Sequence, residues 1–170
     1  MRAWVLALGG LGCLALALPT AHPRLMWNAT ASVPVGLYRL DPPGELKVGD
    51  LVAVQPDDRT ARLLAGGGWL PRGVPLLKPV AALDGQEVCR RAGRILIDGH
   101  VRARVFEGRV AGRQMPRWSG CRRLAEGEIF LLATAPGSFD GRYFGPSSRA
   151  AVLAQAHPLW LSPQEQGRGS

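Results

Sequence analysis

Residues 94–105 read Arg-Ile-Leu-Ile-Asp-Gly-His-Val-Arg-Ala-Arg-Val, and this stretch decides the fold class. Its two runs meet at Asp98-Gly99, a pair typical of a two-residue hairpin, because both turn positions need positive φ. After the turn, Val101, Ala103 and Val105 alternate with arginines, which predicts one buried and one solvated face. A β-hairpin is therefore expected here.

The pattern around the hairpin is that of a β protein. Short apolar runs bounded by Gly, Pro and Asp predict further strands at 51–55, 86–90 and 128–133, the last of them buried and central. Short helices are expected at 60–64, before three glycines, and at 148–157 in the Ala-rich tail. The sequence thus predicts a mainly β, antiparallel domain.

The first 26 residues differ in composition from the rest. An apolar stretch of about sixteen residues runs from Ala3 to Leu18 and ends at Pro19. A membrane-spanning helix needs about 20 residues, and this length is typical of an export signal. Because no clear Ala-x-Ala site follows, we expect an uncleaved anchor at 1–26, with removal as the alternative. The domain is then expected at 27–160, outside the cytoplasm, with a flexible tail at 161–170.

The chain is basic, with 21 Lys and Arg against 13 Asp and Glu and a net charge of +8. The arginines are scattered rather than gathered on one predicted helix, and no zinc-finger spacing or aromatic RNA-binding signature accompanies them. Attraction to anionic lipid headgroups explains the charge as well as DNA does. Charge alone does not decide between the two, but a DNA-binding role conflicts with export, so we expect a membrane lipid surface, and no nucleic acid, as a partner.

Two of the three cysteines lie in the predicted domain. Cys13 falls in the apolar segment, which leaves Cys89 and Cys121. One cysteine pair in an exported domain can form a disulfide, whereas two distant sulfurs make a poor zinc site. A disulfide is expected, with two buried free thiols as the alternative, and no metal or cofactor is predicted.

Lysine occurs only twice, and Lys78 stands inside the nearly apolar run 74–83. Burial disfavours the charged form and lowers the pKa of a lysine, which can then serve as a general base near neutral pH. The alternative is a strand residue whose ammonium reaches solvent. The best candidate nucleophile is Ser32, because Pro34 and Gly36 place it at a turn whose N–H groups could form an oxyanion hole.

A third candidate segment follows the predicted central strand. Residues 135–146 form a glycine-rich loop that contains Ser138, Asp140 and Arg142 together with aromatic residues. Loops of this kind at strand ends often carry functional side chains. This loop is the expected wall of an active site.

Several motifs occur in a fixed order along the chain: Ser-x-Pro-x-Gly-x-Tyr (32–38), Gly-Asp-Leu-Val (49–52), Leu-Lys-x-Val (77–80), Gly-Gln-x-Val (85–88) and Phe-Asp-x-Arg-Tyr-Phe-Gly-Pro (139–146). Their order resembles the serine–lysine signal peptidases, and most of all their conjugative-transfer (TraF-type) branch. The resemblance covers the chain from Trp27 to about Leu159.

The resemblance implies an antiparallel β fold, no cofactor, and a membrane-associated serine endopeptidase. Ser32 matches the nucleophile and Lys78 the general base, while Asp140 and Arg142 match the loop that holds the site together. Such enzymes cut preproteins at the outer face of the inner membrane, facing the periplasm. The conjugative branch matures pilin precursors and can join their ends into a ring.

This chain departs from the family pattern at two positions. Pro79 follows the lysine where Arg is common, and Gly141 stands where a serine often bonds the lysine. Lys78 is therefore expected to use Ser138 or a backbone carbonyl instead. The competing hypothesis is a non-catalytic envelope subunit of a conjugation or secretion apparatus on the same scaffold.

Overall fold

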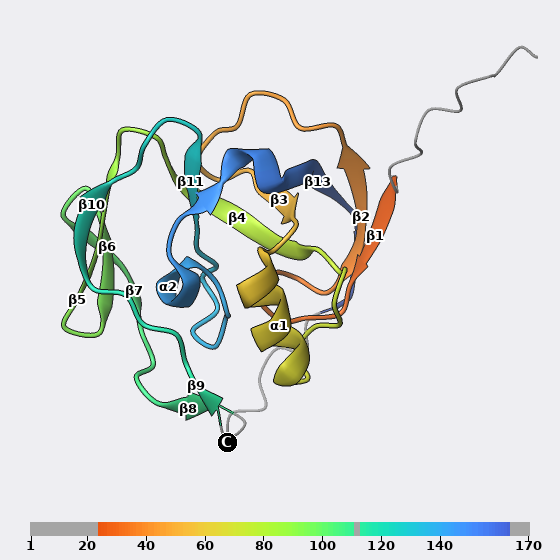
Figure 1. Cartoon of the computed structure of the whole chain (residues 1–170). Helices are drawn as coiled ribbons and strands as arrows, with labels where there is room; N and C mark the ends of the chain where they lie inside the picture. Colours follow the sequence, from red (N-terminus) through yellow and green to blue (C-terminus); the bar gives the residue numbers. More distant parts are fainter. Residues whose placement is uncertain (1–23, 111–112, 164–170) are drawn as a thin grey trace, which may run out of the picture.

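The computed structural model describes residues 24–110 and 113–163, which form two main antiparallel sheets with short helices beside them (Figure 1). The larger sheet has seven strands in the order β1 (Leu25–Asn28), β2 (Gly36–Asp41), β13 (Val152–Leu161), β3 (Leu51–Val54), β4 (Leu76–Leu83), β11 (Glu128–Leu131) and β12 (Ser147–Ser148). The smaller sheet has the order β10 (Gly120–Arg123), β5 (Glu87–Arg91), β6 (Arg94–Ile97) and β7 (His100–Arg104). The remaining elements are α1 (Asp58–Gly66), β8 (Arg109–Val110), β9 (Arg113–Gln114), α2 (Gly141–Phe144) and the 3₁₀ turn η1 (Arg149–Ala151).

The predicted hairpin is confirmed as β6 and β7. Asp98 and Gly99 have φ values of 49° and 78°, the left-handed conformations that this turn requires. One detail is wrong, because Val101 was expected to be buried and is 54% exposed. The register shifts between Ile95 and Leu96, so Val101 pairs with Leu96. A bulge of this kind changes the face on which the following side chains lie.

The other predicted elements are also present, with one exception. Strands β3, β5 and β11 and helix α1 fall within a few residues of the expected positions. The predicted helix at 148–157 is wrong: after η1 the chain continues as β13. Val152, Ala154 and Ala156 are buried in alternation, and β13 fills the place between β2 and β3. Pairing with two distant strands outweighs the local helix preference of alanine.

The two sheets share one continuous interior. β4 lies inside the larger sheet, and the chain passes directly from it into β5 of the smaller sheet. One cluster of buried residues joins Ala82 and Phe130 of the larger sheet to Val88 and Ile95 of the smaller one. Cys89 and Cys121 form the expected disulfide, which connects the paired strands β5 and β10.

Residues 1–23 and 164–170 lie outside the described part of the chain, so most of the predicted anchor and tail are not seen. The last residues of the predicted anchor belong to β1, and Leu161 of the predicted tail ends β13. Among the described residues, no helix has the length and apolar character needed to cross a membrane.

Trp69 is partly buried and packs against Phe139, as a core tryptophan would.

Candidate active site

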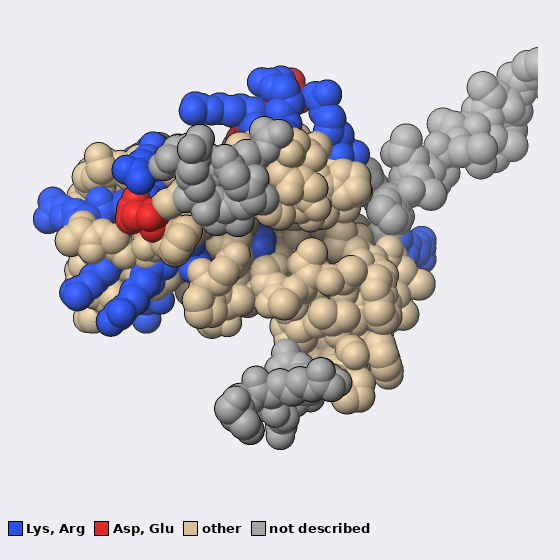
Figure 2. All heavy atoms as spheres, turned by 90° about the horizontal axis from the view of Figure 1, so that it is seen from below, with Lys and Arg blue, Asp and Glu red and all other residues tan. Residues whose placement is uncertain are grey.

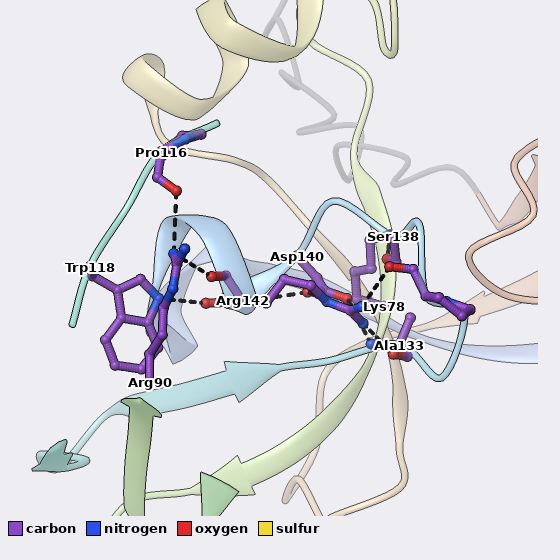
Figure 3. Close-up of polar contacts among 10 residues, drawn as sticks. Lys78, Arg90, Pro116, Trp118, Ala133, Ser138, Asp140 and Arg142 are labelled. Carbon is purple, nitrogen blue, oxygen red and sulfur yellow. Dashed lines mark hydrogen bonds and ion pairs between the residues drawn. The ribbon is translucent and has the colours of Figure 1, made fainter. Parts of the chain in front are cut away.

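Lys78 lies on β4, opposite Val52 of β3, and is buried with 3% of its surface exposed. Its ammonium therefore does not reach out to solvent, and that alternative is wrong. The Nζ atom donates a hydrogen bond to Ser138 Oγ at 2.8 Å (Figure 3). Burial lowers the pKa of Lys78 to about 8; the Asp140 carboxylate opposes this and the Arg142 guanidinium adds to it. About a fifth of the population is then neutral near physiological pH, far more than for an ordinary lysine.

Residues 133–146, here named the closing loop, are held together by a buried ion pair. Asp140 is 0% exposed and Arg142 is 1% exposed. Arg142 Nε donates to Asp140 Oδ1 at 2.7 Å and Nη2 donates to Asp140 Oδ2 at 3.0 Å. Asp140 also accepts from the N–H of Ala133 at 3.0 Å and caps α2 by accepting from the N–H of Arg142. This bidentate geometry gives the pair a single arrangement.

The same guanidinium folds the closing loop back on itself. Arg142 Nη1 donates to Pro136 O at 2.9 Å and Nη2 to Ala133 O at 2.6 Å. The two carbonyls lie at the start of the loop, and Ser138 lies between them and α2. Arg142 thus sets the path of the backbone that presents Ser138 to Lys78.

Gly141 explains why Ser138 is the partner of Lys78 in this chain. A Cβ atom at residue 141 would lie 2.7 Å from Leu131 O and 2.9 Å from the Phe130 ring. No side chain fits there, so a serine at position 141 has no place in this backbone. Of the two partners expected from the sequence, the structure contains the Ser138 hydroxyl.

Ser32 lies in the loop between β1 and β2, which is held by Asn28. The Asn28 side-chain amide donates to the carbonyls of Thr30, Val33 and Pro34 at 2.9 to 3.1 Å. The buried Tyr38 hydroxyl also donates to Pro34 O at 2.6 Å. These bonds fix both ends of the turn that contains Ser32. Asn28 was missed at the sequence level, although an asparagine just before a Ser/Thr/Pro-rich turn is a known signal.

Ser32 and Lys78 line the same cavity, which has a volume of about 800 Å³. Its other walls come from the β1–β2 loop, the segment before β4 and the closing loop, and its lining is mostly apolar. The Ser32 hydroxyl lies 3.2 Å from Thr30 Oγ1. Since Thr30 gives its own hydroxyl hydrogen to Asn28, Ser32 is the donor. In residues 24–110 and 113–163, no hydrogen bond joins Ser32 to Lys78.

Within the described ranges, the side chains of metal-ligand type that cluster are Glu87, Cys89 and Cys121. The two sulfurs are joined in the disulfide, so they are not available as thiolate ligands. This cluster lies on the smaller sheet, apart from the cavity of Ser32 and Lys78.

The family model described as "Signal peptidase, peptidase S26" matches residues 1–161. The chain belongs to this signal peptidase family. The fold and the family expected from the sequence are confirmed.

The relatives that the chain resembles include proteins of conjugal and plasmid transfer. The chain is 36% identical over 151 residues to "Conjugal transfer protein TraF" of Agrobacterium fabrum, covering 78% of this chain and 80% of that protein. It is 30% identical over 165 residues to "Plasmid transfer protein TraF" of Escherichia coli, covering 90% and 92%. A signal peptidase I from Enterococcus faecalis aligns with a TM-score of 0.40 and 17% identity, over 66% of this chain and 97% of that one.

Proposed function

We propose that the chain is a serine endopeptidase in which Ser32 is the nucleophile and Lys78 the general base. One observation carries the proposal: a buried lysine with a pKa of about 8 shares a cavity with a serine on a well-anchored turn. A base is most effective when its pKa lies near the working pH. Lysine occurs at only one other position, Lys47, and arginine carries the remaining positive charge. This composition argues against a solubilising role for Lys78.

The proposed reaction begins with a rotation of the Ser32 side chain from Thr30 toward Lys78. Neutral Lys78 takes the hydroxyl proton as Ser32 Oγ attacks the scissile carbonyl, and backbone N–H groups near Ser32 stabilise the oxyanion. Protonated Lys78 gives the proton to the leaving amine, which leaves an acyl-enzyme on Ser32. Water then releases a carboxylic acid, whereas a substrate amine would form a new amide with no net addition of water.

The proposed substrate is an exported precursor protein, in particular a conjugative pilin precursor. Two features support this class: the names of the relatives refer to conjugal and plasmid transfer, and the cavity has a volume of about 800 Å³ and a mostly apolar lining. An extended, uncharged peptide segment suits such a lining. If the amine that attacks the acyl-enzyme belongs to the same pilin chain as the acyl group, the product is a closed ring.

An exposed apolar surface supports the proposed position at the periplasmic face of the inner membrane. Trp27 of β1 and Trp160 of β13 stack with ring centroids 5.7 Å apart and are 56% and 52% exposed. Leu25, Leu159 and Leu161 are also exposed nearby on these strands. In Figure 2, the view from below, the side of β1 and β2 is mostly tan with a few basic side chains at its margin, whereas Lys and Arg are more frequent on the side of the smaller sheet. Tryptophans of this kind favour the membrane interface.

The experiment is the processing of a pilin precursor in cells that express the chain or one of its variants at matched levels. The variants are Ser32→Ala and Lys78→Ala, with Ser148→Ala and Lys47→Ala as matched controls that lie outside the cavity. Product masses are read by mass spectrometry. Loss of processing in both site variants, with both controls active, supports the dyad.

A product lighter by one water than the linear peptide would add ring closure to the proposal. Unchanged processing in Ser32→Ala and Lys78→Ala would end the enzyme hypothesis. A non-catalytic envelope subunit of a conjugation or secretion apparatus would then be the better interpretation.

A further inference from the structure

Two backbone carbonyls of the closing loop accept hydrogen bonds from side chains outside it. Trp118 Nε1 donates to Gly141 O at 3.0 Å, and Arg90 Nη1 donates to Arg142 O at 2.9 Å (Figure 3). The two acceptors are adjacent residues of α2, directly after Asp140. A helix of four residues has little stability of its own, so external contacts decide where it lies.

Arg90 is a buried cation, with 4% of its surface exposed, and its guanidinium donates hydrogen bonds to carbonyl and carboxylate oxygens. Its Nη2 donates to Glu107 Oε1 at 2.8 Å, and its Nη1 also reaches Pro116 O at 3.3 Å. Burying a guanidinium has a desolvation cost, and an apolar side chain of similar volume would fill the space without it. What the guanidinium supplies here is a set of donors in one fixed plane.

Trp118 is held from the side as well as through its N–H group. Its ring packs edge-on against Phe130 of β11, with centroids 6.0 Å apart and an interplanar angle of 73°. Gly145, at the end of α2, lies close to the ring as well. A Cβ atom built on this glycine would be 3.9 Å from the indole. The indole therefore has one orientation, in which its donor points at Gly141 O.

Both donors come from a part of the chain that the disulfide crosslinks. Arg90 directly follows Cys89 on β5, and Trp118 lies three residues before Cys121 of β10. β5 and β10 are neighbours in the smaller sheet. The position of α2 is thus tied to the smaller sheet, although the cavity lies beside the larger one.

We propose that Arg90 and Trp118 are positioning residues for the active site. They fix α2, and the Asp140–Arg142 pair transmits this position along the closing loop. The loop in turn sets where the Ser138 hydroxyl meets Lys78. The catalytic consequence rests on the proposed function, but the positional consequence can be measured without a substrate.

The measurement is a pH titration of the Lys78 side chain in the full chain, labelled with ¹³C at lysine Cε and followed by NMR. The chain contains only Lys47 and Lys78, so Lys47→Arg assigns the signals. The charged groups that face Lys78 are Asp140 and Arg142, and they are kept in every variant. The test variants are Trp118→Phe, which keeps a ring but has no N–H donor, and Arg90→Gln.

The matched control is Arg117→Gln, because Arg117 is 57% exposed and contacts Glu107 but not the closing loop. In both test variants a displaced loop admits water, so the titration midpoint of Lys78 is expected to rise from about 8 toward 10.5. In a peptidase assay kcat is expected to fall about 10-fold with KM little changed. The control is expected to match the wild type in both measurements.

An unchanged midpoint in Trp118→Phe or in Arg90→Gln, with the fold intact by circular dichroism, removes that residue from the proposal. If Arg90→Gln does not fold, Arg90→Lys replaces it, because a single ammonium cannot serve the same carbonyls in one plane. A wild type without Ser32-dependent cleavage would refute the proposed function, while the titration would still decide the positional role.

Discussion

Lys78 Nζ donates a hydrogen bond to Ser138 Oγ at 2.8 Å across a separation of 60 residues. This bond connects strand β4, inside the larger sheet, to the closing loop, and both residues are buried. It gives the ammonium one defined partner in an otherwise apolar cavity. The predictions below follow from this contact and from the loop that provides it.

Activity should rise with pH through the titration of Lys78. Burial lowers the pKa of Lys78 to about 8, and only the neutral amine can accept the proton of Ser32. Below this pH the base is protonated and inactive, so kcat/KM is expected to climb to a plateau above it. The profile is measured between about pH 6 and about pH 10. Lys47→Arg should keep the same midpoint, and a flat profile in the wild type would contradict the role of Lys78.

Ser138→Ala should impair catalysis without unfolding the protein. The variant removes the acceptor of Lys78 Nζ, so the amine loses its fixed direction toward the cavity. A decrease in kcat of about 10- to 100-fold is expected, as for other small misplacements of a catalytic group. Ser119→Ala is the control, because Ser119 is exposed and lies outside the cavity. Equal kcat values for the two variants would show that Ser138 does not orient Lys78.

Gly141→Ser should destabilise the chain, even though it adds only a small side chain. The new Cβ would lie 2.7 Å from Leu131 O, and backbone cannot move aside as a flexible side chain can. Overpacking of this kind costs about 1–3 kcal/mol in the free energy of unfolding, which urea denaturation measures. Gly137→Ser is the control in the same loop, since its Cβ would meet no atom within 4 Å. Similar stabilities of the two variants would contradict the tight contact.

Asp140→Asn should be far more destabilising than the loss of a surface ion pair. It leaves the Arg142 guanidinium buried with an uncompensated charge, for which a loss of about 3–5 kcal/mol is expected. The comparison is Asp41→Asn, whose partner Arg39 is 53% exposed, with an expected loss of at most about 1 kcal/mol. Urea denaturation of both variants checks the difference. A loss in Asp140→Asn as small as that in Asp41→Asn would mean that the buried pair does not hold the closing loop.

Elements marked by local chemistry could be predicted from the sequence. The Asp98-Gly99 turn requires two positive φ values, and the flanking alternation marks the two strands wherever they lie in the fold. β13 could not be predicted in this way. Its small residues are equally compatible with a helix. The strand forms because β13 pairs with both β2 and β3, which are distant in the sequence.

The sequence alone determined the hairpin, the mainly β class, and the apolar setting that makes Lys78 unusual, because each depends on residues close together in the chain. Only the tertiary structure decided that Ser32 and Lys78 share a cavity, and that Ser138 rather than a carbonyl bonds the ammonium. It also revealed that Arg90 and Trp118 hold α2. These relationships join residues distant in sequence, and they form only when packing excludes water and leaves each buried donor with one acceptor in reach.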